Sequence, residues 1–392
     1  MNTTLKIDEK DNLIVALTDM TSGTEVFWND ESYVLTTDIR AKHKFATENI
    51  EQDGILYMYG VPIGKALVPI RQGEVITTQN VKHYAAPVNL DDETIYEWTA
   101  PNVDRWKDRT FKGYVREDGR VGTRNYWLII PLVFCQNRNV LKLQEALSVP
   151  LGYSTVDYTN ITRHLMGGSD QSISSRRMYP NIDGIRAIQV NSGCGGTDFD
   201  ARSLCTILAN YADHPNVAGV TVFSLGCEKA QIKLFQDQLN HVNPKFNKPL
   251  IIYRQQDCPS EEIMMKTAIE ETFKHLADAN RLERTDVPLS KLKIGVKCGG
   301  SDGFSGISAN PVMGIVSDRI VALGGGSCLA EFPELCGAEG NILERCINYS
   351  DKEKFLAYDK EKIDNVKLLN YYCYLRSRMH WHKNKRDTYI AT

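Results

Sequence analysis

Short apolar runs alternate with helical patterns through the middle of the chain. The runs are residues 127–135, 184–191, 217–225 and 249–253, and the helical patterns that follow them cover residues 139–148, 199–212, 229–239 and 260–279. Runs of this length without polar interruption are typical of strands that are buried on both faces. Strands that alternate with helices predict a mostly parallel sheet with helices on both of its faces.

The first 85 residues have a different pattern. Four short runs rich in β-branched and aromatic residues are separated by turn residues, and they lie at 13–17, 25–28, 55–59 and 75–78. This pattern predicts a small β-rich domain at residues 1–85. Residues 86–112 carry proline and acidic residues without a sustained period, so we expect them to form a linker to an α/β domain at 113–285.

A second α/β region is predicted at residues 286–373. It contains an apolar run at 291–296, a helical pattern at 312–323 and a short strand at 327–330. Residues 374–392 are strongly basic and show no packing pattern, so we expect a disordered tail. The chain is therefore assigned to the α/β class, with a small β-rich domain in front of mostly parallel sheets.

The composition excludes several classes of partner. Of 392 residues, 42% are hydrophobic and 24% are charged, and the net charge is -3. No basic stripe precedes the tail, so a nucleic-acid partner is not expected. The first residues lack the apolar core of a signal peptide, and no apolar run is long enough to span a bilayer. We therefore expect a cytoplasmic protein without a membrane partner, in which the ten cysteines are reduced.

A glycine-rich loop, residues 297–311, follows the apolar run at 291–296. It combines a thiol, a carboxylate and hydroxyl groups with four glycines. Glycines let the backbone approach a ligand closely, and side chains such as Ser301 and Asp302 are able to hydrogen-bond a polyhydroxylated or anionic molecule. The alternative is a plain turn that joins a strand to a helix.

Four cysteines lie at or just after the carboxyl ends of predicted strands, namely Cys135, Cys194, Cys227 and Cys298. A parallel sheet brings such positions to one edge. Four thiols there favour a soft-metal or iron site, whereas the alternative is that some of them are packing cysteines. Glutamates after the last predicted strand, including Glu334, are interpreted either as metal or general-base carboxylates or as helix caps.

Three motifs, taken together, resemble the altronate dehydratase and galactarate dehydratase family. They are residues 113–126, residues 298–311 and residues 331–339. The first domain, through residues 11–17, 43–44 and 59–66, resembles the SAF domain of this family, a small β-clip-like module. The resemblance covers about residues 5–372.

Two departures from the family pattern stand out. Relatives continue past the equivalent of Tyr372 with a further segment that contains glycine and cysteine, so we expect the second α/β region to be incomplete. Residues 77–80 replace a histidine-rich stretch at the end of the SAF domain, so no histidine function is expected there.

The resemblance implies a hydro-lyase that converts D-altronate to 2-keto-3-deoxy-D-gluconate and water, as part of hexuronate degradation. Such a reaction needs a base, an electrophile for the enolate charge and an acid for the departing hydroxide. The resemblance implies Fe²⁺ as the cofactor, with Mn²⁺ as an alternative, and a homo-oligomer that takes a small sugar acid. The alternatives are galactarate dehydratase, sulfolactate sulfo-lyase and a catalytically inactive family member, whereas no G-x-G-x-x-G motif supports a dinucleotide-binding oxidoreductase.

The candidate residues fall into three groups. The acid/base group is His43, Lys44 and Glu334, although a lone histidine in a small β domain is more often a surface residue. The substrate-binding group is Arg124, Asn125, Lys297, Ser301, Asp302 and Asn310, in which the basic residues hold the carboxylate and the loop residues hold hydroxyls. The metal-binding group is Cys135, Cys194, Cys227 and Cys298.

Overall fold

The computed structural model describes residues 3–29, 31–84, 98–154, 164–167, 176–297, 303–330, 339–346 and 348–356. The chain divides into two compact units, one formed by Met1–Arg105 with Lys293–Thr392 and the other by Trp106–Leu292. Both strands and helices are present, and the predicted α/β class with a β-rich first domain is confirmed.

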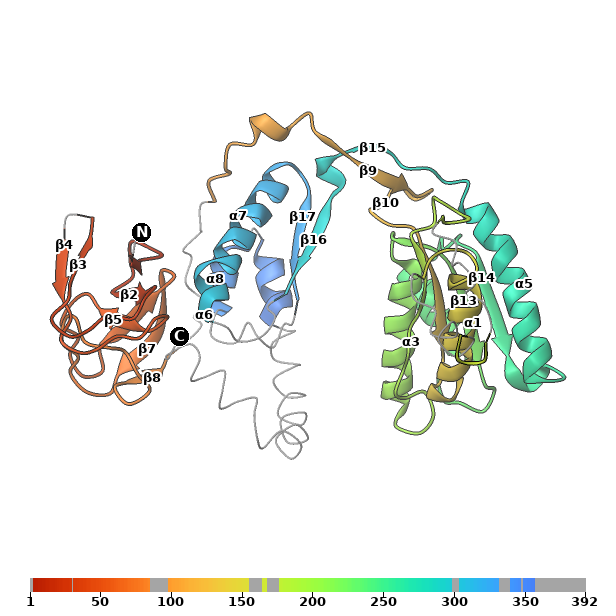
Figure 1. Cartoon of the computed structure of the whole chain (residues 1–392), viewed down its shortest axis with the longest axis horizontal. Helices are drawn as coiled ribbons and strands as arrows, with labels where there is room; N and C mark the ends of the chain where they lie inside the picture. The colour runs from red at the N-terminus through yellow and green to blue at the C-terminus, as the bar shows by residue number, and fades with distance from the viewer. Residues whose placement is uncertain are drawn as a thin grey trace. The chain divides into compact units, whose positions relative to one another are not determined.

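The first domain consists of antiparallel strands (Figure 1). Its sheets are β1 (Thr4–Leu5), β2 (Leu13–Ala16) and β5 (Lys44–Ala46); β3 (Glu25–Trp28) and β4 (Glu31–Val34); and β6 (Ile55–Met58), β7 (Val61–Ala66) and β8 (Val81–His83). Alternation along β2 sends Leu13 and Val15 into one apolar cluster and Ile14 into another. The domain therefore has a core on each side of its central strand.

The strand predicted at 75–78 is wrong. Only Val75 makes a bridge, to Phe45. The side-chain oxygen of Asn80 accepts the backbone N–H of Thr77 at 2.8 Å, and the side-chain amide of Asn80 donates to the Val75 carbonyl at 2.8 Å. This side chain therefore occupies backbone groups that a strand would use for pairing, and it closes a turn instead.

The second unit contains the predicted parallel sheet. Its strand order is β12 (Gly184–Ala187), β11 (Tyr126–Pro131), β13 (Val217–Ser224) and β14 (Leu250–Arg254), and every pair is parallel. Alternate side chains of β11 point to opposite faces. Trp127 and Ile129 pack with α1 (Asn137–Ser148) and α5 (Glu261–Ala279), and Leu128 packs on the other face with α3 (Asp198–Asp213) and α4 (Ile232–Val242).

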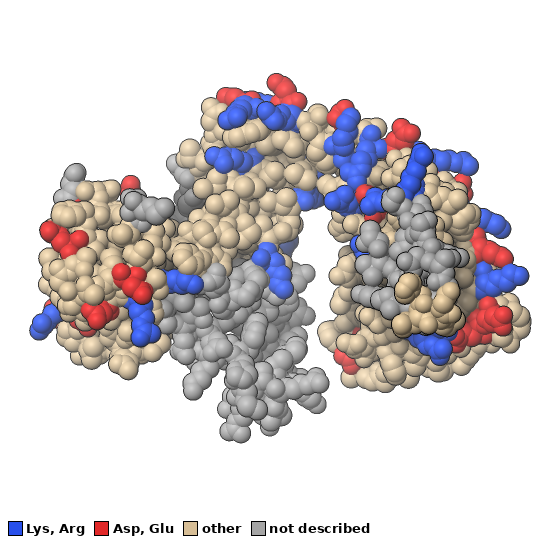
Figure 2. Space-filling view, in the orientation of Figure 1, with Lys and Arg blue, Asp and Glu red and all other residues tan. Residues whose placement is uncertain are grey.

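A second, antiparallel sheet of this unit was not predicted. Its order is β10 (Val121–Gly122), β9 (Thr110–Val115) and β15 (Thr285–Pro288), and it pairs Gly113 with Thr285. This pairing joins the beginning of the unit to its end. On the face shown in Figure 2, acidic and basic side chains are interspersed along α5.

The C-terminal region belongs to the first unit. The strands β16 (Lys293–Val296) and β17 (Gly326–Leu329) pair in parallel, and the helices are α6 (Gly303–Ile307), α7 (Ala309–Ala322) and α8 (Glu339–Glu344). α6 lies against the β-rich first domain, because Ile307 packs on the cluster that contains Leu13 and Val15. No helix among the described residues is both long and apolar enough to cross a membrane.

Candidate functional site

The strand order of the parallel sheet marks one place where a ligand site is expected. The chain passes from β11 to β12 on one side and then returns to β13 on the other side of β11. The connections that leave β11 and β13 enter helices on opposite faces, so their loops separate at the carboxyl ends of these two strands. Open α/β sheets bind ligands at such a point of reversal.

The structure places three of the predicted cysteines at this edge. Cys135 lies in the short helix η2 (Phe134–Gln136) after β11, Cys194 lies in the loop after β12, and Cys227 lies in the loop after β13. All three are exposed free thiols. Within the described part of the chain, no three His, Cys, Asp or Glu residues are grouped so as to hold a metal ion, and Cys298 lies outside that part.

The three cysteine loops are tied to one another by hydrogen bonds. The backbone N–H of Phe134 donates to the Ser192 carbonyl at 3.0 Å. The N–H groups of Lys229 and Ala230 both donate to the Gly193 carbonyl, at 2.8 and 3.1 Å. The Lys229 ammonium forms an ion pair with Asp198 at 3.0 Å. The loops after β11, β12 and β13 therefore form one connected layer.

Two glycines in this layer are required by space and by backbone angle. Gly193 has φ +105°, and a Cβ there would lie 2.2 Å from the Leu132 carbonyl oxygen. Gly226 has φ +121°, and a Cβ there would lie 2.3 Å from the side-chain oxygen of Gln256. A Cβ at position 193 would force backbone to move, whereas a Cβ at position 226 would displace the Gln256 side chain and would strain the backbone through its positive φ.

The motif at residues 113–126 lies at the opposite edge of the sheet. Asn125 directly precedes β11, Asp183 precedes β12 and Asn216 precedes β13, so the motif packs at the amino ends of the strands. β11 has six residues, which span about 20 Å at ~3.3 Å per residue. Within this unit, Arg124 and Asn125 therefore lie at the edge of the sheet opposite to the three cysteine loops.

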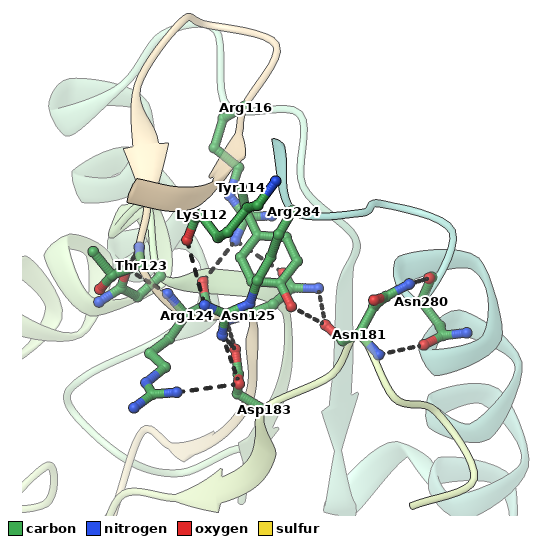
Figure 3. A network of polar contacts seen from close by, with 11 residues as sticks. Lys112, Tyr114, Arg116, Thr123, Arg124, Asn125, Asn181, Asp183, Asn280 and Arg284 are labelled. Carbon is green, nitrogen blue, oxygen red and sulfur yellow. Dashed lines mark hydrogen bonds and ion pairs between the residues drawn. The ribbon is translucent and has the colours of Figure 1, made fainter. Parts of the chain in front are cut away.

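Asn125 is at the centre of a network of polar contacts (Figure 3). It is fully buried, and its amide donates to the carbonyls of Asn181 at 3.0 Å and Ala279 at 3.4 Å and accepts from Arg116 at 2.9 Å. Its backbone N–H donates to Asp183 at 2.8 Å. Every polar group of this side chain is used within the fold, which speaks against direct contact with a substrate.

Arg124 is more accessible. Its side chain is 56% exposed and makes a long ion pair, 3.5 Å, with Asp183 (Figure 3). Asp183 is also held by Arg284 at 2.9 Å. Arg124 is thus a cation at the amino edge of the sheet.

Arg120 forms a two-point ion pair at the same edge of the sheet. The Arg120 guanidinium binds both carboxylate oxygens of Asp213, at 2.6 and 2.8 Å. Burial alone would raise the pKa of Asp213, but the hydrogen bonds from Arg120 and Asn243 hold that pKa below its ordinary value. This pair joins the motif to the end of α3.

The acid/base candidates His43 and Lys44 lie at the start of β5. Lys44 pairs with Val15, so its side chain points to the apolar cluster on that face, and it is only 2% exposed. Burial lowers the pKa of Lys44 to about 8. Burial, and then the charges of Lys44 and Arg40, also lower the pKa of His43.

The β5 segment lies beside the helix that follows the glycine-rich loop. The Lys42 ammonium lies 4.5 Å from the centre of the Phe304 ring in α6, and Ile307 of α6 packs on the cluster that Lys44 faces. Lys297 and Asn310, on either side of α6 in the sequence, are both exposed. Cys298, Ser301, Asp302 and Glu334 lie outside the described residues.

Three protein-family models match successive parts of this chain. Residues 2–84 match the "Altronate/galactarate dehydratase SAF domain", residues 113–280 match "D-galactarate dehydratase/Altronate hydrolase, second domain", and residues 289–370 match "D-galactarate/Altronate dehydratase, C-terminal". The altronate dehydratase of Escherichia coli (strain K12) is 31% identical over 379 residues, which are 92% of this chain and 68% of that protein. The chain belongs to the altronate and galactarate dehydratase family.

Two other members of the family are similar to this chain over a comparable share of its length. The altronate dehydratase of Bacillus subtilis (strain 168) is 33% identical over 89% of this chain and 63% of its own length. The galactarate dehydratase (L-threo-forming) of Escherichia coli (strain K12) is 28% identical over 92% of this chain and 65% of its own length. The chain thus spans about two thirds of the length of these relatives.

Sequence reasoning did not single out Glu228 and Lys229, which order the thiol loops. The signal was present, because a charged pair directly follows Gly226 and Cys227 at the end of a buried strand. Glu228 is 2% exposed, whereas a carboxylate in a loop is usually solvated. Burial is a property of the folded chain, so the sequence alone did not distinguish this glutamate from an ordinary surface one.

Proposed function

We propose that this chain is a sugar-acid dehydratase whose substrate is D-altronate and whose product is 2-keto-3-deoxy-D-gluconate. The observation that carries the proposal is the similarity to two altronate dehydratases along about nine tenths of the chain. The galactarate relative is less similar, at 28% identity, which favours the aldonate over the aldarate.

The chemistry requires a base near neutral pH. The base takes the C2 proton, the C3–O bond breaks while an acid protonates the departing hydroxyl so that it leaves as water, and the resulting enol loses its O–H proton and takes a proton at C3 to become the 2-keto acid. We assign proton removal at C2 to the neutral amine of Lys44. A lysine with a pKa of about 8 has a substantial neutral fraction near pH 8, whereas an ordinary lysine has almost none.

The remaining polar groups are assigned by their charge and exposure. The exposed Lys297 lies at the start of the glycine-rich loop and suits the substrate carboxylate, and Asn310 suits a hydroxyl. His43 is a second proton carrier beside Lys44. A divalent metal, with Fe²⁺ or Mn²⁺ as candidates, would stabilise the enolate charge when bound. The exposed thiols of Cys135, Cys194 and Cys227 are donors that suit iron, but the described residues do not complete a ligand set.

The test is an assay for the 2-keto-3-deoxy acid. The purified chain is prepared anaerobically with ferrous or manganous ion and is offered altronate, galactarate or sulfolactate in separate reactions. We expect product from altronate, and at least about a hundredfold less from the variant Lys44→Met. Product from galactarate alone, or sulfite release from sulfolactate, would replace the proposed substrate.

A catalytically inactive family member is the competing function. It predicts no product from any of the three substrates under any metal condition. Lys44→Met removes the base, and no hydrogen bond of its side chain to another described residue is lost, so activity that survives this variant would keep the reaction and reassign the base.

A further inference from the structure

Glu228 is a buried carboxylate in the middle of the thiol-bearing loops. It follows Cys227 directly and is 2% exposed. The Ser224 hydroxyl donates to one of its oxygens, and the backbone N–H of Gly226 donates to the other at 2.6 Å. Among the described residues, no lysine, arginine or histidine forms a salt bridge with it. Its two buried side-chain oxygens therefore each accept a hydrogen bond from residues shortly before Cys227.

These two bonds fix the shape of the turn that carries Cys227. Gly226 has φ +121°, and its N–H points at the Glu228 carboxylate. The side-chain amide of Gln231 closes the same turn from the other side by donating to the Glu228 carbonyl. The turn is thus held from both ends, and the Cys227 thiol lies on its exposed side.

The Gly226–Cys227 turn also holds the loop that follows β12. The next two N–H groups, of Lys229 and Ala230, converge on the Gly193 carbonyl, directly before Cys194. The Lys229 ammonium also donates to the Gly196 carbonyl at 3.1 Å, on the other side of Cys194. A turn of different shape would aim these donors elsewhere.

We propose that Glu228 is a positioning residue: its buried carboxylate sets the Gly226–Cys227 turn and, through Lys229 and Ala230, the loop that carries Cys194. The proposed dehydratase function is needed only for the catalytic part of the test. Glu228 is not assigned contact with substrate.

The carboxamide is a matched variant. In Glu228→Gln, the side-chain oxygen still accepts from Gly226, and the NH₂ group is able to donate to the Ser224 hydroxyl, which accepts as well as donates. Glu228→Ala removes both acceptors, so the part-buried Gly226 N–H and the buried Ser224 hydroxyl lose the hydrogen bonds that they make to Glu228. Glu270→Ala, at an exposed glutamate of α5, is the control for loss of a carboxylate elsewhere in the unit.

Hydrogen exchange of the full chain, followed by mass spectrometry, measures the effect without any assay of activity. In Glu228→Ala we expect exchange to be about tenfold faster in peptides that cover residues 225–231 and 192–197, and unchanged in β11. We expect Glu228→Gln to stay within about threefold of the wild type. Unchanged exchange at 192–197, or equal acceleration in β11, would overturn the proposal.

A second variant decides the matter if Glu228→Ala does not fold. Ser224→Ala removes one donor and leaves the bond from Gly226. Faster exchange in residues 225–231 and 192–197, with β11 unchanged, supports the proposal, and wild-type exchange in either of these two segments overturns it.

Turnover then separates positioning from mere structure. In Glu228→Ala we expect kcat to fall about tenfold or more while KM stays within about twofold, with most of the loss restored in Glu228→Gln. Faster hydrogen exchange in the loops of Glu228→Ala, together with a wild-type kcat, would overturn the positioning role. A wild-type chain that is inactive towards all sugar acids would refute the proposed function, and the exchange result would still decide the role of Glu228 in the loops.

Discussion

At the scale of single residues, Lys44 is unusual because its ammonium is buried without a carboxylate partner among the described residues. The difference between a pKa of about 8 and the ordinary 10.5 corresponds to about 3 kcal/mol at ~1.4 kcal/mol per unit. A native state that keeps such a cost is typical of a functional site.

We therefore expect Lys44→Met to stabilise the protein by about 1–3 kcal/mol at pH 7, since it replaces a buried ammonium with an apolar chain of similar length. Urea denaturation measures this change. Lys82→Met is the control, because Lys82 is exposed and pairs with Asp53 at 3.8 Å on the surface, and it should be within about 0.5 kcal/mol of the wild type. A stability loss in Lys44→Met would show that the amine is satisfied in the native state.

The same shift predicts how stability depends on pH. The pKa of Lys44 is lower in the folded chain than in the unfolded chain, so between pH 8 and 10.5 the unfolded chain binds more protons. The contribution of Lys44 to stability therefore rises with pH in this window. The stability gap between Lys44→Met and the wild type should be full below pH 8 and close by about pH 10.5, and a gap that does not depend on pH would contradict this.

Asn125 and Arg124 are neighbours with opposite environments. Asn125→Ala leaves the carbonyls of Asn181 and Ala279 and the Arg116 guanidinium short of a partner, so we expect a loss of about 2–4 kcal/mol. Arg124→Ala should cost less than about 1 kcal/mol, since its side chain is exposed and its ion pair is long. Thermal unfolding of both variants measures the difference, and equal losses would refute the assignment of Asn125 to the fold.

At the scale of elements, the parallel sheet and its helices were predictable because the local spacing of apolar residues along the sequence indicates each of them. The run at 217–225 became β13 at 217–224, and the helical pattern at 260–279 became α5 at 261–279. The pairing of β9 with β15 was not predictable, because it joins Gly113 to Thr285 through geometry that no local pattern carries. The glycines of the loops did not show at which residue a strand or helix begins or ends, but they indicated where the chain turns tightly.

Gly193 and Gly195 are two glycines of one loop with positive φ and different surroundings. A Cβ at Gly193 would lie 2.2 Å from a backbone oxygen, whereas a Cβ at Gly195 would meet nothing within 4 Å. We expect Gly193→Ala to destabilise the protein by about 2 kcal/mol or more and Gly195→Ala by about 1 kcal/mol. Chemical denaturation of the two variants checks the order. A larger loss of stability in Gly195→Ala than in Gly193→Ala would mean that the loop after β12 shifts at little cost in free energy.

At the scale of the whole molecule, the candidate site residues come from segments far apart in the sequence. The rule that strand ends share an edge was sufficient to group Cys135, Cys194 and Cys227. The same rule places Arg124 and Asn125 at the amino edge, because they directly precede their strand, but the sequence analysis applied it only to residues that follow strands. Burial decided the role of Asn125, and burial appears only in the folded chain.

Each unit has its own apolar clusters, so we expect each unit to unfold as its own cooperative transition. Differential scanning calorimetry of the full chain should resolve two transitions. Lys44→Met should raise the midpoint of one, and Asn125→Ala should lower the midpoint of the other. A single transition that both variants shift together would show that the units unfold as one.

The separation of the arginine and asparagine motif from the thiol loops, at opposite ends of the same strands, has a consequence for inherited or engineered variants. Substitutions in residues 113–126 should reduce the amount of protein that a cell accumulates, since they expose buried donors and acceptors to quality control. Substitutions at the exposed Cys135, Cys194 or Cys227 should leave abundance normal and act on the phenotype alone. Comparing protein abundance with growth on the proposed substrate, variant by variant, would therefore distinguish the two edges of the sheet in living cells.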